Sequence, residues 1–211
     1  MKVVVFGATG DTGIPLVKQL LQEGHEVTAL VRKPEKFMLS GEKLEVVKGD
    51  VLNSSTIEGK MTGKDAVISV LGGNYREPTT VYSEGIKNII SEMDHAGVKR
   101  LICLSAETLK SKEETSFTGR ILVNVLWKVL HNLYRDMQRM EAEIYKSNVD
   151  WTIFRPPYLT KGAPKGHYRI NLDKPITKGK GHITRSDLAL AMIHQLKNPD
   201  SIHRIAYVCA N

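Results

Sequence analysis

Three glycines spaced three residues apart stand near the start of the chain, at Gly7, Gly10 and Gly13. An apolar, β-branched run at residues 3–6 precedes them, and a segment with helical spacing of apolar residues follows. This order predicts a strand, a tight turn and a helix. Gly7 suits the turn, Gly10 lets the phosphates of a ligand approach the backbone, and Gly13 lets the helix pack closely on the strand. The pattern therefore favours a site for the pyrophosphate of a dinucleotide at the N-terminus of that helix.

Two hydroxyl side chains, Thr9 and Thr12, stand between these glycines and add donors for a phosphate. The alternative is a glycine turn that binds nothing. The strand before the glycines and the helix after them are the context that the phosphate-binding motif requires, so the binding interpretation is the stronger.

Two cations, Arg32 and Lys33, follow the predicted second strand at residues 26–31. A site for NAD usually has Asp or Glu there, about 20 residues past the glycines, to hold the ribose hydroxyls. Cations suit the 2′-phosphate of NADP instead. The sequence therefore predicts NADP (as NADPH) rather than NAD, with a solvated basic turn as the alternative.

Further candidates follow the next predicted strands, at Asp50, Gly72 and Ser105. In an open sheet of parallel strands, ligands bind beyond the carboxyl ends of the strands. Asp50 suits a hydrogen bond from the adenine amino group, and a carboxylate that caps the following turn is an equal alternative.

The apolar pattern predicts strands that alternate with helices along the chain. Strands are expected at residues 3–6, 26–31, 44–48, 65–71, 99–104, 151–155 and 204–209. Helices are expected at residues 14–24, 55–60, 80–95, 121–147 and 183–197, and loops with one short strand at 161–180. Helical crossovers between strands imply a parallel sheet with helices on both faces. The predicted fold class is α/β, a Rossmann-type doubly wound parallel sheet in a single domain over residues 1–211.

The longest predicted helix, at residues 121–147, carries apolar residues at helical spacing, which favours a crossover helix packed on the sheet. The apolar positions are Leu122, Leu126, Val129, Leu133, Met137, Met140 and Ile144. Its first part, residues 121–130, is apolar on more than one face and includes Trp127. That surplus suits a cover over a substrate pocket or a contact with a partner subunit.

The net charge of +7 comes from lysines and arginines that are scattered along the chain, without a dense block. This distribution disfavours nucleic-acid binding, and an anionic small ligand accounts for a basic site equally well. No apolar run approaches the roughly 20 residues of a membrane span, and residues 3–6 are too few for a signal-peptide core. We therefore expect a cytoplasmic protein without membrane contact.

The chain has two cysteines, Cys103 and Cys209, and both lie in apolar, strand-like runs. Neither these cysteines nor the seven histidines show a spacing typical of metal ligands. Reduced, inert cysteines and no metal are expected.

Seven segments spread in order over nearly the whole chain carry a family resemblance: residues 7–13, 30–32, 49–51, 65–68, 78–85, 156–157 and 183–189. The chain resembles the atypical short-chain dehydrogenase/reductases, an NAD(P)H-binding (NmrA-like) family. Within it, the chain looks most like the group of NADPH-dependent flavin reductases and biliverdin-IXβ reductases, and the run at 78–85 is the narrowest match. The resemblance implies a Rossmann-type domain that binds NADP in an extended pose.

Carried over by position, the resemblance implies that residues 10–13, which include Asp11, face the pyrophosphate. Arg32 then meets the 2′-phosphate, and Asp50 and Val51 contact the adenine.

The same resemblance assigns the rest of the nucleotide. Leu71 and Gly72 line the middle of the cofactor, and Ser105 and Ala106 lie near the nicotinamide.

The far wall of the active site is assigned to Pro157 and Tyr158. Most short-chain dehydrogenases use Tyr-x-x-x-Lys as a proton donor, but none of the seven tyrosines here has a lysine four residues later. The flavin-reductase group also lacks this pair. That group often has His at the position of Tyr158 and another near Met137, so histidine-assisted proton transfer is not expected here.

These residues together predict an NADPH-dependent oxidoreductase that transfers hydride to a planar, conjugated acceptor such as a flavin, a quinone or a biliverdin-like molecule. A flavin would be a substrate rather than a bound cofactor, because the protein need only hold nicotinamide C4 near the acceptor. The substrate pocket is expected from residues 105–135 and 156–182.

Ser105 and Tyr158 are the candidate catalytic residues. Ser105 suits orientation of the nicotinamide amide or the acceptor, and its alternative is a strand-end hydroxyl bonded to backbone. Tyr158 suits stacking or hydrogen bonding with the acceptor, and its alternative is a half-buried wall tyrosine.

A non-enzymatic NADP-binding redox sensor of the NmrA-like kind is the main rival, because such proteins keep the glycine turn and lack Tyr-x-x-x-Lys. An epimerase of the extended type ranks lower, since the C-terminal part leaves little room for a sugar-nucleotide domain. A monomer and a homodimer fit equally well.

Overall fold

An eight-stranded sheet forms the centre of the molecule, in the strand order β3-β2-β1-β4-β5-β6-β10-β8. The computed structural model describes residues 1–73, 77–109 and 117–211, with the backbone alone at 117–126. The strands are β1 (Lys2–Phe6), β2 (Glu26–Val31), β3 (Leu44–Lys48), β4 (Ala66–Ser69), β5 (Arg100–Leu104), β6 (Asp150–Arg155), β8 (Tyr168–Leu172) and β10 (Arg204–Ala210). All neighbours pair in parallel except β10 and β8. This order confirms the predicted Rossmann-type, doubly wound α/β fold.

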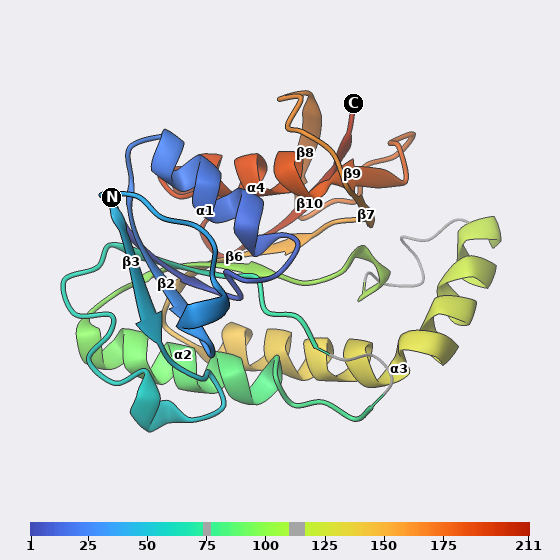
Figure 1. Ribbon diagram of the computed structural model, residues 1–211. Helices are drawn as coiled ribbons and strands as arrows, with labels where there is room; N and C mark the ends of the chain where they lie inside the picture. Colours follow the sequence, from blue (N-terminus) through green and yellow to red (C-terminus); the bar gives the residue numbers. More distant parts are fainter. Residues whose placement is uncertain (74–76, 110–116) are drawn as a thin grey trace.

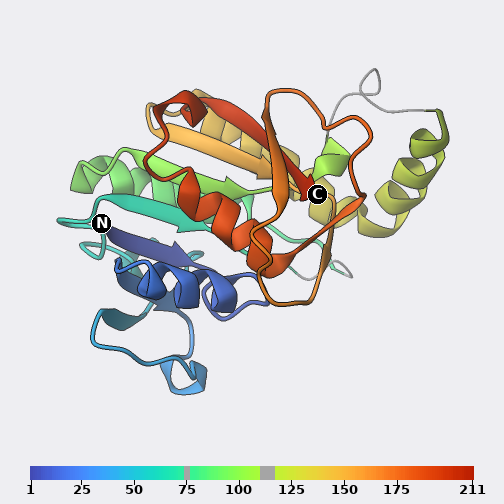
Figure 2. The ribbon, with the colours of Figure 1, turned by 90° about the horizontal axis from the view of Figure 1, so that it is seen from above.

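Two pairs of helices cover the two faces of this sheet. Helices α1 (Gly13–Gln22) and α4 (Arg185–His194) pack together on one face, and α2 (Ser83–Ala96) and α3 (Phe117–Lys146) on the other (Figure 1). Figure 2 shows α1, in blue, and α4, in red, lying over the same face. Because both faces are covered, the inner strands are mainly apolar, and Val3, Val4 and Val5 are wholly buried.

The last third of the chain departs from the purely parallel sheet that the sequence predicts. The one short strand expected within 161–180 is β8, but it runs antiparallel to β10 at the edge of the sheet. Two further strands, β7 (Tyr158–Thr160) and β9 (His182–Thr184), form a small parallel pair that the sequence did not indicate. The helix expected at 55–60 is wrong, since only a 3₁₀ turn at Ser54–Thr56 forms there.

Helix α3 is interrupted at Leu130, whose φ of −107° and ψ of 18° are not helical. In Figure 1 its first turns stand at an angle to the rest of the helix. After the interruption, Met137, Met140 and Ile144 are buried against the sheet as predicted. Val129 is 60% exposed, so its predicted place on the packed face is wrong. The side chains of Leu122 and Leu126 lie outside the described residues.

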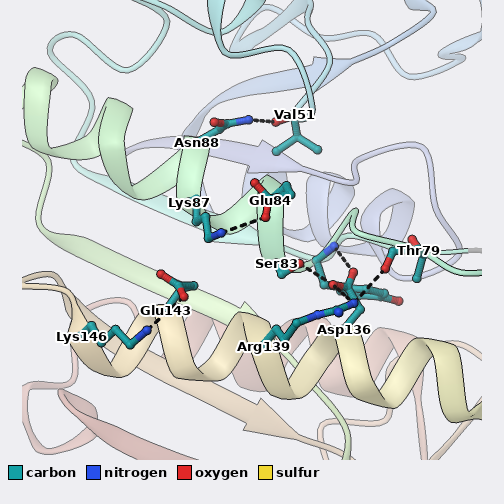
Figure 3. Close-up of polar contacts among 11 residues, drawn as sticks. Val51, Thr79, Ser83, Glu84, Lys87, Asn88, Asp136, Arg139, Glu143 and Lys146 are labelled. Atoms are coloured by element: carbon teal, nitrogen blue, oxygen red, sulfur yellow. Dashed lines mark hydrogen bonds and ion pairs between the residues drawn. The ribbon is translucent and has the colours of Figure 1, made fainter.

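The N-terminus of α2 is held by a buried carboxylate from α3 (Figure 3). Asp136 is wholly buried and accepts hydrogen bonds from the Tyr82 amide (2.9 Å) and the Ser83 hydroxyl (2.5 Å). Arg139 lies 3.3 Å from the same carboxylate. A carboxylate at this end satisfies unpaired N–H groups and complements the helix dipole. This contact explains why the run at 78–85 has a defined structure.

Cys103 and Cys209 are both free and buried. Burial raises the pKa of the Cys103 thiol to about 12, which opposes thiolate formation. Within the described part of the chain, no three His, Cys, Asp or Glu side chains gather as metal ligands do. The described helices include none that is both long and apolar enough to cross a membrane.

Candidate functional site

The three glycines of the turn between β1 and α1 differ in the space around them. Gly7 has a φ of +79°, and a Cβ on it would lie 2.3 Å from the Val70 carbonyl oxygen. A Cβ on Gly13 would lie 2.1 Å from the Gly7 oxygen, whereas one on Gly10 would meet that oxygen at 3.3 Å. The fold itself therefore requires Gly7 and Gly13. At Gly10 the missing side chain leaves bare backbone, which suits a phosphate.

A cavity of about 1360 Å³ begins at this turn and runs along the carboxyl ends of β1, β2, β4, β5 and β6. Its walls are polar and glycine-rich near the turn, with Arg32 and Asp50 beyond it. At the other end an apolar wall comes from α3, formed by Leu130, Leu133 and Met137. Ligand pockets usually measure about 300–1,000 Å³, so this one has room for more than a single small molecule.

Most of the sequence-predicted site residues line this one cavity. They are Gly7, Thr9, Gly10, Asp11, Thr12, Arg32, Asp50, Val51, Leu71, Gly72, Ser105, Ala106, Pro157 and Tyr158. Two predicted residues stand apart from its wall: Gly13, which packs against Gly7, and Lys33, which is exposed before a 3₁₀ turn. Which of these residues touch a nucleotide stays a prediction.

Asp50 has the turn-capping role that the sequence left open. Its Oδ1 accepts from the Leu52 amide at 3.0 Å, and its own amide donates to the Thr56 hydroxyl at 2.8 Å. The residue also lines the cavity. Capping therefore holds the carboxylate in place at the cavity, and its contact with adenine remains a prediction.

Ser105 lies at the end of β5, where its amide donates to the Phe154 carbonyl at 2.8 Å. Its side chain is nearly buried on the cavity wall, and its hydroxyl donates to Glu141 Oε1 at 2.5 Å. The alternative interpretation, a hydroxyl bonded to backbone, is therefore wrong: the partner is a carboxylate on α3.

Glu141 is itself held by a buried ion pair. Arg155, at the end of β6, donates from Nε to Glu141 Oε1 at 3.1 Å and from Nη2 to Oε2 at 2.5 Å. The Tyr145 hydroxyl also donates to Oε2, at 3.2 Å. Burial alone would lower the pKa of Arg155, but the Glu141 carboxylate raises it further than burial lowers it. Burial, with the same carboxylate, raises the pKa of Tyr145 to about 12.

Tyr158 is 75% exposed, so the half-buried wall tyrosine considered as its alternative role is wrong. It begins β7 and lines the cavity with a side chain that is largely open to solvent. A contact with an acceptor at this position remains a prediction.

The sequence analysis singled out neither Glu141, which lies behind the cavity wall, nor Arg185, and it included Tyr134 only within the expected pocket range 105–135. Tyr134 is nearly buried in the cavity wall, and its ring is tilted by 57° to that of Trp127 with the centroids 5.3 Å apart. Burial raises the pKa of Tyr134, which keeps its hydroxyl protonated. Arg185 opens α4 in the cavity wall, with Nη2 3.8 Å from Asp11 Oδ2.

Sequence signals for these residues are weak. Arg185 belongs to the segment 183–189 that carries the family resemblance, and a cation at a helix start is a usable hint. Tyr134 and Glu141 read as ordinary positions on a long helix, and only the fold brings them to the cavity.

The two segments expected to form the substrate pocket both reach the cavity. The wall includes Ser105, Thr108 and Tyr134 from 105–135, and Pro157, Leu159 and Gly181 from 156–182. Of the apolar stretch 121–130, Leu130 lines the cavity and Val129 points to solvent. An acceptor bound between these segments remains a prediction.

The fold and the cavity define a Rossmann-type dinucleotide-binding protein. Residues 7–199 match the NAD(P)H-binding family, so the chain belongs to that family. The glycine turn with its bare backbone at Gly10 and the size of the cavity fit a nicotinamide dinucleotide.

Individual relatives cover nearly the whole chain. An uncharacterised chloroplastic protein of Arabidopsis thaliana is 28% identical over 222 residues, which cover 99% of this chain and 76% of that protein. A solved structure from Bacteroides thetaiotaomicron, provisionally named an epimerase, is 31% identical with a TM-score of 0.76, covering 99% and 96% of the two chains. The anaerobillin reductase ChuY of Escherichia coli O157:H7 has a TM-score of 0.79 and covers 100% and 97%, but its 19% identity shows the fold alone.

Proposed function

We propose that the protein is an NADPH-dependent reductase that transfers hydride to a planar, conjugated acceptor such as a flavin, a quinone or a biliverdin-like molecule. One observation carries the proposal: a single cavity of about 1360 Å³ joins the glycine turn to the apolar wall of α3. A dinucleotide fills the glycine-rich part, and the remaining apolar part suits a flat, apolar partner.

The chain's own residues bind and orient in this proposal. The turn at Gly10 receives the pyrophosphate, and Arg32 receives the 2′-phosphate. Leu133 and Met137 exclude water beside the nicotinamide, which supplies the hydride when it is bound. The Tyr134 hydroxyl, kept protonated by burial, is a candidate proton donor in the cavity wall.

The rival is an NADP-binding sensor without turnover. One observation favours it: Gln138, not Lys, stands four residues after Tyr134, so the usual proton-donating pair of short-chain dehydrogenases is missing. Flavins and quinones take up their proton from water readily, so the missing lysine does not exclude the reductase.

Anaerobic oxidation of NADPH by the purified protein, with FMN, riboflavin or a small quinone, separates these functions. A reductase turns over well above the uncatalysed rate and prefers NADPH to NADH. A sensor binds NADPH and oxidises none of it with any acceptor. An epimerase, the function that the Bacteroides name suggests, keeps its cofactor and shows no net oxidation either.

Preference for NADPH is expected to depend on Arg32. Removing a charged hydrogen-bonding partner costs about 1.5–3 kcal/mol, so Arg32→Ala should raise the KM for NADPH about 10- to 100-fold and leave that for NADH unchanged. Lys36→Ala removes a nearby exposed cation outside the cavity and is the matched control. An equal rise in the KM for NADPH in both variants would mean that the overall positive charge matters, and not a contact between Arg32 and the 2′-phosphate.

A further inference from the structure

A carboxylate stands directly behind the polar residue at the nicotinamide end of the cavity. Ser105 is 4% exposed, and its hydroxyl donates to Glu141 Oε1 at 2.5 Å. Glu141 is itself 4% exposed and is absent from the cavity wall. It reaches a bound ligand only through Ser105.

The proton of the Ser105 hydroxyl is committed to this bond. A serine hydroxyl has one proton and two lone pairs, and an ionised carboxylate only accepts. Two donors of Arg155 pair with the Glu141 carboxylate, Nε with Oε1 at 3.1 Å and Nη2 with Oε2 at 2.5 Å. The lone pairs of Ser105 Oγ are therefore what a ligand in the cavity meets.

The Glu141 carboxylate is fixed in place, so it cannot turn away from the Ser105 hydroxyl. Its Oε2 also accepts from the Tyr145 hydroxyl at 3.2 Å, and Arg155 is anchored by Nη1, 3.1 Å from the Tyr207 hydroxyl. The side chains of the ion pair are only 10% and 5% exposed, so rotation of either would leave a buried charge unpaired.

We propose that Glu141 is a positioning residue that makes Ser105 a pure hydrogen-bond acceptor, and that this acceptor selects the carboxamide of nicotinamide over the carboxylate of nicotinate. The inference rests on the proposed binding of NADP with its nicotinamide at Ser105. A carboxamide N–H donates to Ser105 Oγ. A carboxylate has no proton to give and brings a second negative charge towards Glu141.

The test compares binding of oxidised NADP with that of its deamidated analogue, nicotinic acid adenine dinucleotide phosphate, by isothermal titration calorimetry. The wild-type protein should bind the analogue at least about tenfold more weakly, because the carboxamide hydrogen bond is lost and a carboxylate faces the lone pairs of Ser105 and the charge of Glu141. Ser105→Ala should weaken NADP binding and bring the affinities for NADP and the analogue closer together.

Glu141→Gln is the decisive variant. Arg155 makes its shorter contact with Oε2, so the glutamine oxygen is expected there. The amide nitrogen then faces both Ser105 and Arg155 Nε, and Arg155 Nε loses its acceptor. The serine proton then turns to the cavity, and the analogue should gain affinity relative to NADP. Glu143→Gln, which loses only its pair with Lys146 on the same helix, should leave the ratio unchanged. Thermal melts show which variants are folded.

Equal affinity of the wild-type protein for the two nucleotides overturns the inference. So does a ratio that neither Ser105→Ala nor Glu141→Gln changes. Failure of the proposed function has a different signature, because the wild-type protein then binds neither nucleotide or binds NADP without turnover.

Discussion

At the scale of single residues, the three glycines of the turn have different physical tasks. Gly10→Ala adds a methyl group that meets only the Gly7 oxygen at 3.3 Å, so the protein should fold and lose affinity for NADPH more than about tenfold. Gly13→Ala forces a methyl group to 2.1 Å from the same oxygen and should destabilise the fold by about 1–3 kcal/mol or more. Calorimetric titration and thermal melts measure the two effects.

The two variants are each other's control. Gly10→Ala should lower affinity with little change in melting temperature, and Gly13→Ala should lower the melting temperature. Undiminished affinity of Gly10→Ala would exclude the glycine turn as the pyrophosphate site.

His25 makes the stability of the fold depend on pH. It is 8% exposed, within the described residues its Nδ1 has no hydrogen-bond partner, and burial lowers its pKa below the usual 6.5. As the pH falls below about 6.5, the unfolded chain takes up a proton that the folded protein takes up only at lower pH. The free energy of unfolding should therefore fall in that range, and His25→Gln should flatten the slope. Denaturant unfolding of both proteins between pH 7.5 and 5 measures this pH dependence. The same dependence in the wild-type protein and in His25→Gln would show that His25 is not its cause.

Residues that follow a strand end were predictable, and residues that reach the site from a distant element were not. Arg32 and Ser105 stand at the ends of apolar runs, and parallel strands bring such ends to one edge. Glu141 lies 36 residues beyond Ser105, and Arg185 meets Asp11 across most of the chain length. Such pairs depend on how helices pack, which a sequence pattern does not contain.

At the scale of elements, the contact between α2 and α3 depends on one carboxylate. Asp136→Asn keeps the shape and removes the charge that accepts from Tyr82 and Ser83 and pairs with Arg139. A buried group left with a mismatched partner costs about 1–3 kcal/mol. At about 2–4 °C per kcal/mol for a chain of this size, the melting temperature should fall by about 2–12 °C.

Glu84→Gln is the control at the same helix end. Its carboxylate is half exposed and pairs with Lys87 at 2.8 Å, so its loss should cost at most about 0.5 kcal/mol. Equal losses in the two variants would mean that any charge at the start of α2 matters as much as the buried one.

Long elements with a clear period were predicted well, and short ones were not. Helix α3 covers the expected 121–147 apart from its ends, because its buried residues recur at helical spacing. Strands β7 and β9 have three residues each and flank a stretch rich in Lys, Gly and Pro, so no alternation reveals them. No Gly or Pro stands near Leu130, so the sequence does not predict the interruption of α3 there.

At the scale of the whole molecule, the chain order dictates where the cavity lies. The first half of the chain supplies β1 to β5, which lie in the order β3-β2-β1-β4-β5, and the second half adds β6, β10 and β8 beyond β5. Alternation of strands and helices, with right-handed crossovers, makes this arrangement predictable from sequence. The cavity then spans the carboxyl ends of strands from both halves, and in the proposed function a cofactor and an acceptor meet there.

The most direct test of hydride transfer in this cavity traces a deuterium label from C4 of NADPH. NADPH carrying deuterium at C4, on either the pro-R or the pro-S face, is oxidised anaerobically with FMN by the protein, and the NADP produced is analysed by mass spectrometry. A nicotinamide held in this cavity presents one face to the acceptor. We therefore expect one labelled form to lose all its deuterium and the other to keep it, and Gly10→Ala to lower the rate of turnover when NADPH is limiting. Loss of label from both faces, or tight NADPH binding without oxidation, would contradict hydride transfer within the cavity.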